Sequence, residues 1–241
     1  MGFSRLYDKN SKEPFKLSRT KIENFIKCPR CFYIDRRLGI GQPPGFPFTL
    51  NSAVDCLLKK EFDVYRADKK IHPLMEHYGL KAVPFQNEKM DEWRENFVGV
   101  QFLHKPTNLL IFGAVDDIWV NEDGELMVVD YKATSSETKP TLDAEYRQGY
   151  KRQMEIYQWL LRNNGFKVSD TGYFVYANGR KDLKAFDGKL EFDVDLLDYT
   201  GSDGWIENTL LEIKKCLDSD KIPGYTEDCD YCKYQQKILK I

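Results

Sequence analysis

The chain has 241 residues and a net charge of −2, with 36 Lys and Arg against 38 Asp and Glu. Hydrophobic residues make up 41% and charged residues 31%, which excludes a disordered chain and is ordinary for a globular protein with a sizeable core. No apolar run reaches the roughly 18 residues of a membrane span, and the first residues lack the apolar stretch of a signal peptide. We therefore expect a cytoplasmic protein that does not enter a membrane.

Helical patterns dominate the first part of the chain. Residues 1–17 are predicted to be a charged lead-in, and Ser18 can cap a helix that is interrupted at Cys28-Pro29. A short helical turn over residues 31–37 and a loop over residues 41–48 follow. Apolar residues then recur at helical spacing over residues 50–66, and residues 67–95 are predicted to be irregular or to form short helices.

Strand patterns begin after residue 95. They cover residues 97–104, 109–120 and 125–132, and a turn at residues 121–124 indicates that the last two form a hairpin. A helix over about residues 143–164, strands near 173–176 and 190–194, and a helix over 205–217 complete the order. The sequence therefore predicts an α/β fold, with a mixed central sheet flanked by helices, in one domain spanning residues 1–241.

Two acidic residues and a lysine are associated with the predicted hairpin. Alternation along a strand places Asp130 and Lys132 on one face and Tyr131 on the other, and Asp116 on the neighbouring strand can lie close to Asp130. Carboxylates are hard ligands that suit Mg²⁺ or Mn²⁺, and Lys132 could orient an attacking water. An isolated Asp-x-Lys would more simply be a surface ion pair, but the added Gly113-x-x-Asp116 favours a metal site.

Three motifs in order resemble the RecB-like branch of the PD-(D/E)XK nuclease superfamily: Gly113-Ala-Val-Asp116, Asp130-Tyr-Lys132 and Gln153-Met-Glu-Ile-Tyr157. The resemblance implies a restriction-endonuclease-like core and a metal-dependent nuclease acting on DNA with a single-stranded or free end. It implies that Asp116, Asp130 and the carbonyl of Tyr131 bind the metal, and that Lys132 is the catalytic lysine. It further implies that Gln153 and Tyr157 help to position the substrate and the active-site groups.

One position departs from that family pattern. A helix that precedes the strands usually carries Gly-x-x-x-His, and the matching stretch here is Asn51-Ser-Ala-Val-Asp55. Aspartate can replace histidine as a third, oxygen-donating metal ligand, and we expect Asp55 in that role. The alternative is that Asp55 lies in water at the edge of its helix.

The cysteines suggest a second metal site. Cys28-x-x-Cys31 and Cys229-x-x-Cys232 are two pairs with metal-ligand spacing, so residues 18–39 and 222–241 are predicted to meet in a structural staple that brings the termini together. In the similar CRISPR-associated RecB-like exonucleases and AddB-type nucleases such cysteines hold a [4Fe-4S] cluster, and the two-and-two distribution also suits Zn²⁺. The remaining two cysteines, Cys56 and Cys216, are predicted to be small core residues.

Alternatives to a nuclease stay open from the sequence. Basic residues between 19 and 37, interleaved with Phe32 and Tyr33, could follow a single-stranded phosphate backbone and stack on bases, or form a solvated helix face. The chain could be a non-catalytic nucleic-acid-binding module on the same fold, or a zinc-stapled protein-interaction domain. The resemblance leaves room for a helicase or CRISPR-type protein partner, but no residue indicates one.

Overall fold

The computed structural model describes residues 6–43, 45 and 49–240. The chain divides into two compact units, each with its own sheet. Unit 1 comprises Met1–Gly45, Gln101–Gly113 and Gly204–Ile241, and unit 2 comprises Phe46–Val100 and Ala114–Asp203. The single domain over residues 1–241 stays a prediction. Parts of the predicted lead-in (residues 1–5) and of the predicted loop (residues 44 and 46–48) lie outside the described residues.

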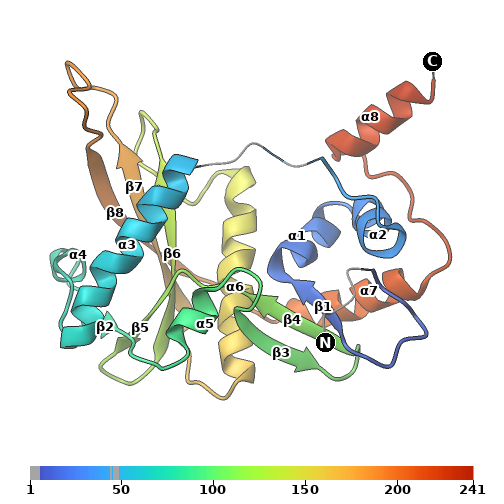
Figure 1. Ribbon diagram of the computed structural model, residues 1–241, viewed down its shortest axis with the longest axis horizontal. Coiled ribbons are helices and arrows are strands. Elements are labelled where there is room, and N and C mark those ends of the chain that lie inside the picture. The colour runs from blue at the N-terminus through green and yellow to red at the C-terminus, as the bar shows by residue number, and fades with distance from the viewer. Residues whose placement is uncertain (1–5, 44, 46–48, 241) are drawn as a thin grey trace. The chain divides into compact units, whose positions relative to one another are not determined.

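Unit 1 contains a three-stranded sheet in the order β1-β4-β3. Its strands are β1 (Phe15–Ser18), β3 (Val100–His104) and β4 (Leu109–Gly113), and β1 runs parallel to β4. Its helices are α1 (Arg19–Lys27), α2 (Pro29–Leu38), α7 (Ile206–Asp218) and α8 (Asp230–Ile238) (Figure 1). The end of the predicted lead-in is thus a strand, because Phe15 and Leu17 alternate into the core.

Local sequence signals set the break between α1 and α2. The Ser18 hydroxyl caps α1 by accepting a hydrogen bond from the Lys21 N–H at 3.3 Å. Cys28 ends α1 and caps α2, whose first residue is Pro29, a position where proline costs no helical hydrogen bond. Gly39, with a φ of 78°, ends α2 in the left-handed conformation that glycine adopts readily.

Unit 2 contains a five-stranded sheet in the order β2-β5-β6-β7-β8. The strands are β2 (Ala82–Pro84), β5 (Asp117–Asn121), β6 (Leu126–Thr134), β7 (Thr171–Gly179) and β8 (Phe192–Thr200). The β6–β7 pair is parallel and the other pairs are antiparallel. The helices are α3 (Thr49–Asp68), α4 (Pro73–His77), α5 (Met90–Arg94) and α6 (Gln148–Asn163), the last preceded by the 3-10 turn η1 (Glu145–Arg147). The predicted α/β fold with a mixed sheet flanked by helices is confirmed.

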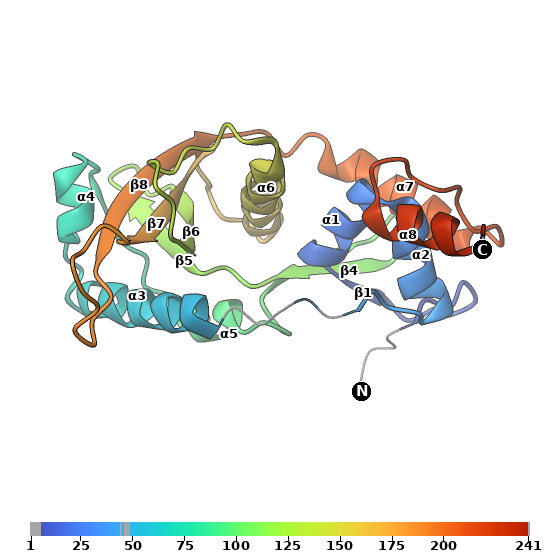
Figure 2. The ribbon, with the colours of Figure 1, turned by 90° about the horizontal axis from the view of Figure 1, so that it is seen from above.

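Helices α3 and α6 cover opposite faces of this sheet (Figure 2). Phe62 of α3 packs with Trp119 and Tyr131 in a buried cluster on one face. Gln153 of α6 contacts Asp130 on the other face, as the alternation along β6 requires. The sheet therefore presents Tyr131 to one helix and Asp130 to the other.

The predicted strand over residues 109–120 is wrong in one respect that matters for the site. The stretch forms two strands in different sheets, with β4 ending at Gly113 and β5 beginning at Asp117. Asp116 therefore lies in the connection between strands and not within one. An apolar pattern shows which residues are buried but not where the chain passes from one sheet to another. Within the described residues, no helix has the length and apolar character needed to cross a membrane.

Candidate active site

Asp116 and the Asp-x-Lys segment meet at the start of β5 and in β6. Asp130 is buried, and its Oδ1 accepts a hydrogen bond from Gln153 Nε2 at 2.7 Å, while its other oxygen pairs with the Lys132 ammonium. The Asp116 Oδ2 accepts a hydrogen bond from the backbone N–H of Tyr131 at 2.9 Å. The residue between Asp130 and Lys132 thus fixes Asp116 beside this segment.

Lys132 is held in its charged form by the same carboxylates. Burial lowers the pKa of a lysine, but the charges of Asp130 and Asp116 outweigh it and raise the pKa of Lys132 above its usual value. The Lys132 Nζ also lies 4.7 Å from the ring centre of Tyr150, within range of a cation–π contact. Lys132 is therefore an ammonium beside these carboxylates.

Gln153, one of the predicted pair on α6, is in contact with Asp130. Gln153 Nε2 approaches both Asp130 Oδ1, at 2.7 Å, and the Tyr157 hydroxyl, at 3.2 Å. Both side chains are buried, and their spacing of four residues places them on one helical face. The pair orients the Asp130 carboxylate from the α6 side of the sheet.

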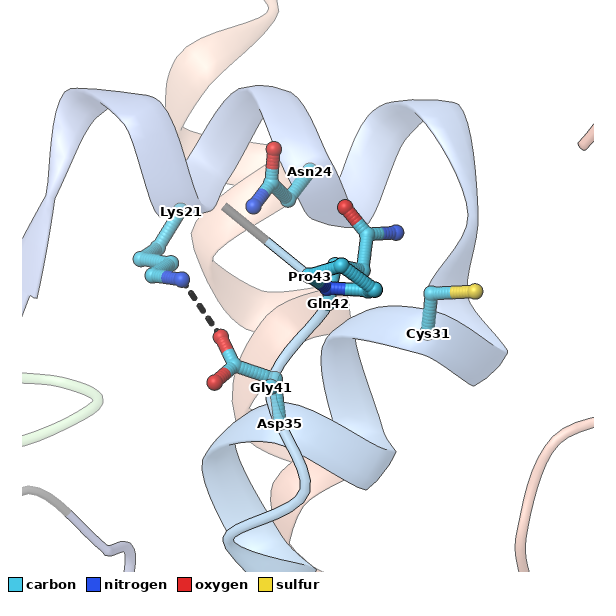
Figure 3. Close-up of a pocket in the computed structure, with 7 residues that line it drawn as sticks. All are labelled: Lys21, Asn24, Cys31, Asp35, Gly41, Gln42 and Pro43. Carbon is cyan, nitrogen blue, oxygen red and sulfur yellow. Dashed lines mark hydrogen bonds and ion pairs between the residues drawn. The ribbon is translucent and has the colours of Figure 1, made fainter. Parts of the chain in front are cut away.

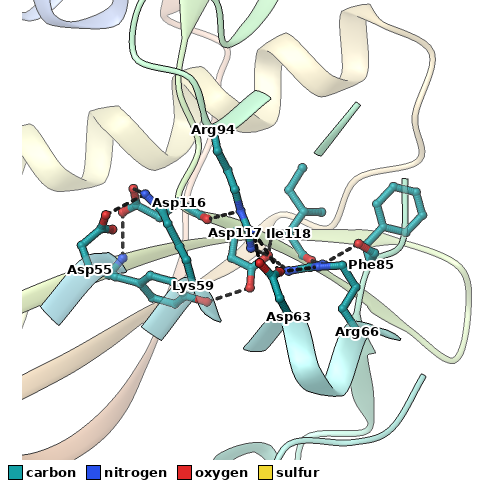
Figure 4. A network of polar contacts seen from close by, with 10 residues as sticks. Asp55, Lys59, Asp63, Arg66, Phe85, Arg94, Asp116, Asp117 and Ile118 are labelled. Atoms are coloured by element: carbon teal, nitrogen blue, oxygen red, sulfur yellow. Dashed lines mark hydrogen bonds and ion pairs between the residues drawn. The ribbon is translucent and has the colours of Figure 1, made fainter. Parts of the chain in front are cut away.

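Asp55 reaches Asp116 through a lysine that the sequence analysis did not identify. The Lys59 Nζ lies 2.8 Å from Asp55 Oδ2 and 3.3 Å from Asp116 Oδ1 (Figure 4). Burial and the charge of Asp116 raise the pKa of Asp55, and the charge of Lys59 only partly offsets them. The signal available in the sequence was the spacing of four between Asp55 and Lys59 on a helix.

The donor set fits a hard divalent cation, although the carboxylates do not form a closed cage. In the described part of the chain, the cysteines are the one group of three or more His, Cys, Asp or Glu residues whose ligand atoms all lie within 4.8 Å of one another. Asp55, Asp116 and Asp130 therefore do not converge that closely as a set. Carboxylate oxygens still suit Mg²⁺ or Mn²⁺, which keep several waters and need few protein ligands. The Tyr131 carbonyl as a ligand stays a prediction.

A buried ionic network around Asp117 contacts the backbone of Asp116. Asp117 is 0% exposed and accepts hydrogen bonds from Arg66 Nη2 at 2.5 Å, Arg94 Nη2 at 3.1 Å and the Tyr131 hydroxyl at 2.7 Å. The Arg94 Nε also donates to the backbone carbonyl of Asp116 at 3.0 Å (Figure 4). The network therefore fixes the backbone of Asp116 and the ring of Tyr131 together.

A tyrosine on β7 lies on the face of the sheet that carries Asp130 and Lys132. Tyr176 is in register with Lys132 on the parallel neighbour strand, and the guanidinium of Arg147 lies 5.6 Å from its ring centre. Burial raises the pKa of Tyr176, and the charges of Arg147, Lys132 and Asp130 also act on it. Tyr176 is therefore a neutral hydroxyl close to the predicted catalytic groups, and no sequence motif pointed to it.

The four predicted cysteines of unit 1 come together. The Sγ atoms of Cys28 and Cys232 are 3.6 Å apart, as are those of Cys31 and Cys229. Burial raises the pKa of Cys28, but hydrogen bonds from Thr226 and Cys31 outweigh this effect and lower the pKa from its ordinary value to about 7. The predicted approach of the two terminal segments in a four-cysteine site is confirmed.

A cavity of about 210 Å³ adjoins this cysteine site. Cys31 lines it together with Asn24, Gln42 and the ion pair between Lys21 and Asp35, whose charged atoms are 2.5 Å apart (Figure 3). One of the four thiols is therefore next to a polar cavity.

Three predictions from the sequence are corrected. Phe32 and Tyr33 are buried and cannot stack on bases, because the apolar side of α2 packs into the core. Lys21 and Arg36 both pair with Asp35, so part of the expected basic face is neutralised within the fold. Cys56 is exposed on α3 and is not a core residue, and Cys216 on α7 is only partly buried.

A known protein family matches the part of the chain that contains most of these residues. A model of the PD-(D/E)XK nuclease superfamily matches residues 58–236, a range that contains Asp116, Asp130 and Lys132 but begins after Asp55. A search of curated proteins finds no match. Among solved structures, the chain is similar to one described as "Crystal structure of SSO0001", with 16% identity and a TM-score of 0.45 over 96% of this chain and 86% of that chain. That likeness is too low to assign fold or function.

Proposed function

The chain belongs to the PD-(D/E)XK nuclease superfamily, and from this premise we propose that it is a divalent-metal-dependent nuclease of the RecB-like branch that hydrolyses phosphodiester bonds in DNA. Single strands and free ends are the proposed substrates. The membership supports metal-dependent nuclease activity in general, and the three RecB-like motifs support the branch. DNA as the nucleic acid rests on the resemblance of those motifs.

One observation supports the proposal most directly. The hydrogen bond from the Tyr131 N–H to Asp116 joins the Gly-x-x-Asp motif to the Asp-x-Lys motif, although the first begins at the end of β4 and the second lies within β6 of the other sheet. Two carboxylates and an ammonium thereby come together along the second half of β6. A surface hairpin would not need the added support of Gln153 and of the Asp117 network.

The residues have distinct proposed roles. Asp116, Asp130 and the Tyr131 carbonyl bind Mg²⁺ or Mn²⁺, with Asp55 as a further oxygen ligand. The bound ion supplies charge that polarises the phosphate and stabilises its transition state. Lys132, charged and held beside Asp130, positions the attacking water and neutralises charge on the phosphate oxygens. Gln153 and Tyr157 keep the Asp130 carboxylate in its orientation.

The test compares the degradation of end-labelled DNA in Mg²⁺ and Mn²⁺ by the wild type and by Asp130→Ala and Lys132→Ala. Each variant should lose at least about 100-fold in rate, since each lacks a group that acts on the reacting atoms. Asp193→Ala and Lys189→Ala remove exposed groups near β8 and should cleave like the wild type. Equal activity in all five proteins would contradict the proposed function. Linear and single-stranded DNA should be degraded, and closed circular duplex should not.

A second candidate function is a nucleic-acid-binding module without catalysis. The contact of Lys59 with both Asp55 and Asp116 favours it, because an internal ammonium already neutralises two of the proposed metal ligands. Binding of DNA with no cleavage under any divalent ion would support this function over the first.

The cysteine site is proposed to be a structural metal centre that ties the terminal segments of unit 1 together. Thiolates that bind zinc at about 2.3 Å lie about 3.8 Å from one another in a tetrahedron. The observed spacings of 3.6 Å, within a group whose sulfurs all lie inside 4.8 Å, agree with that value. Thiolates of a [4Fe-4S] cluster bind different irons and lie farther apart. The spacing thus favours Zn²⁺, and the cluster suggested by the motif resemblance is the alternative.

A further inference from the structure

The face of unit 2 that carries Asp130 contains a polar group with no role in the proposed metal chemistry. Tyr176 is 2% exposed, and its hydroxyl has no hydrogen-bond partner among the described residues. A buried hydroxyl without a partner costs free energy, and native structures contain few of them. Such a group at a candidate active site indicates a missing binding partner.

The surroundings of Tyr176 define what kind of partner would fit. Its register with Lys132 places both side chains on the same face of the sheet, because neighbouring residues of parallel strands share a face. The Arg147 guanidinium lies 5.6 Å from the Tyr176 ring centre, and the Lys132 ammonium lies 4.7 Å from the ring centre of Tyr150. The Arg147 guanidinium, the Tyr176 hydroxyl and the Lys132 ammonium, which pairs with Asp130, thus lie on one face of the sheet. This combination is complementary to an anion with several acceptor oxygens.

We propose that Tyr176 and Arg147 bind a phosphate of the nucleic-acid strand beside Lys132. The Tyr176 hydroxyl donates a hydrogen bond to a non-bridging oxygen, and the Arg147 guanidinium neutralises the same phosphate. The planar arrangement of guanidinium N–H donors matches the geometry of phosphate oxygens. Arg147 and Tyr150 are partly exposed, so a bound strand can contact them, and access to the buried hydroxyl requires these two side chains to move. The inference rests on the proposed function, because it names how that site holds its substrate.

The first test removes only the hydroxyl. Tyr176→Phe keeps the ring and its contact with Arg147, and should slow single-turnover cleavage roughly 10- to 100-fold, the effect of losing a hydrogen bond to a charged group. Its melting temperature should equal or exceed that of the wild type, since the hydroxyl has no partner in the folded protein. Tyr173→Phe is the matched control, because Tyr173 lies on the same strand and packs against the cluster on the opposite face.

The second test measures binding without cleavage. The affinity for single-stranded DNA is followed against salt concentration, both without a divalent ion and in Ca²⁺. Arg147→Gln should make the slope of log K against log salt shallower by about 0.7, the effect of losing one phosphate contact. Arg180→Gln removes a surface cation that pairs with Asp182, and should leave the slope unchanged.

The outcomes separate this inference from the proposed function. If the wild type cleaves DNA and Asp130→Ala does not, while Tyr176→Phe and Arg147→Gln behave like their controls, the phosphate site is refuted and the nuclease stands. If the wild type cleaves nothing, the proposed nuclease function is refuted, and the salt dependence of DNA binding then tests the phosphate site by itself. A shallower slope for Arg147→Gln alone then supports the phosphate site, and equal slopes overturn it.

Discussion

The carboxylate of Asp117 is fully buried between two arginines, and its removal tests how the ionic network holds unit 2. Asp117→Ala takes one acceptor away from Arg66, Arg94 and the Tyr131 hydroxyl at once. Breaking a buried ion pair on one side costs about 3–5 kcal/mol, because the remaining charge is left uncompensated. Both arginines keep a second partner in Asp63, so the lower end of this range is expected, about 3 kcal/mol.

Urea unfolding followed by circular dichroism measures this loss, and the melting temperature should fall by roughly 6–12 °C for a protein of this size. Asp123→Ala, in the exposed turn after β5, is the control and should change stability by less than about 0.5 kcal/mol. A loss below about 1 kcal/mol for Asp117→Ala would refute the view that the buried charges depend on this carboxylate.

A double variant tests the physical reason for that loss. If the cost comes from an uncompensated arginine, then Arg66→Met should destabilise the Asp117→Ala protein much less than it destabilises the wild type. Additive losses would show that the two residues act independently, against the short contact between them.

Three further predictions concern charge and thiol chemistry. Lys59→Met removes the ammonium that competes for Asp116, so Mn²⁺ should bind roughly three- to tenfold more tightly by titration calorimetry; weaker binding would contradict the competition. Cys28→Ser should lower the bound metal per chain and the stability by several kcal/mol, whereas Cys56→Ser should change neither, as metal analysis and urea unfolding will show. Burial raises the pKa of Cys216 to about 11, so its alkylation should accelerate only as the pH rises toward 11, and mass mapping at pH 8 should find exposed Cys56 modified first.

The sign of the Cys216 prediction follows from which form reacts. The thiolate is the nucleophile, and a raised pKa means that the thiolate is scarce at neutral pH and becomes abundant only near the raised value. Because the unfolded chain ionises this thiol near its ordinary value, the folded state should also lose stability between about pH 9 and pH 11. Rapid labelling of Cys216 at pH 8 in the folded protein would contradict its burial.

The residue types and spacings were sufficient for much of the candidate site. Two Cys-x-x-Cys pairs predicted a four-cysteine site, which distances of 3.6 Å confirm, since thiols at metal-ligand spacing have few other reasons to be paired. The strand alternation around Asp130 and Lys132 placed Tyr131 on the opposite face, as the helix contacts show. Periodicity of two or 3.6 residues is a local property, so a single sequence carries it.

The tertiary structure alone decided the rest. Only the folded chain brings Lys59 between Asp55 and Asp116 and puts Tyr176 beside Lys132. It also brings Arg94 into contact with the backbone carbonyl of Asp116. The division of residues 109–120 between two sheets was likewise invisible in an apolar pattern that continues through both strands. Contacts between residues far apart in sequence depend on strand order and helix packing, and these are set by the balance of the whole fold and not by local propensity.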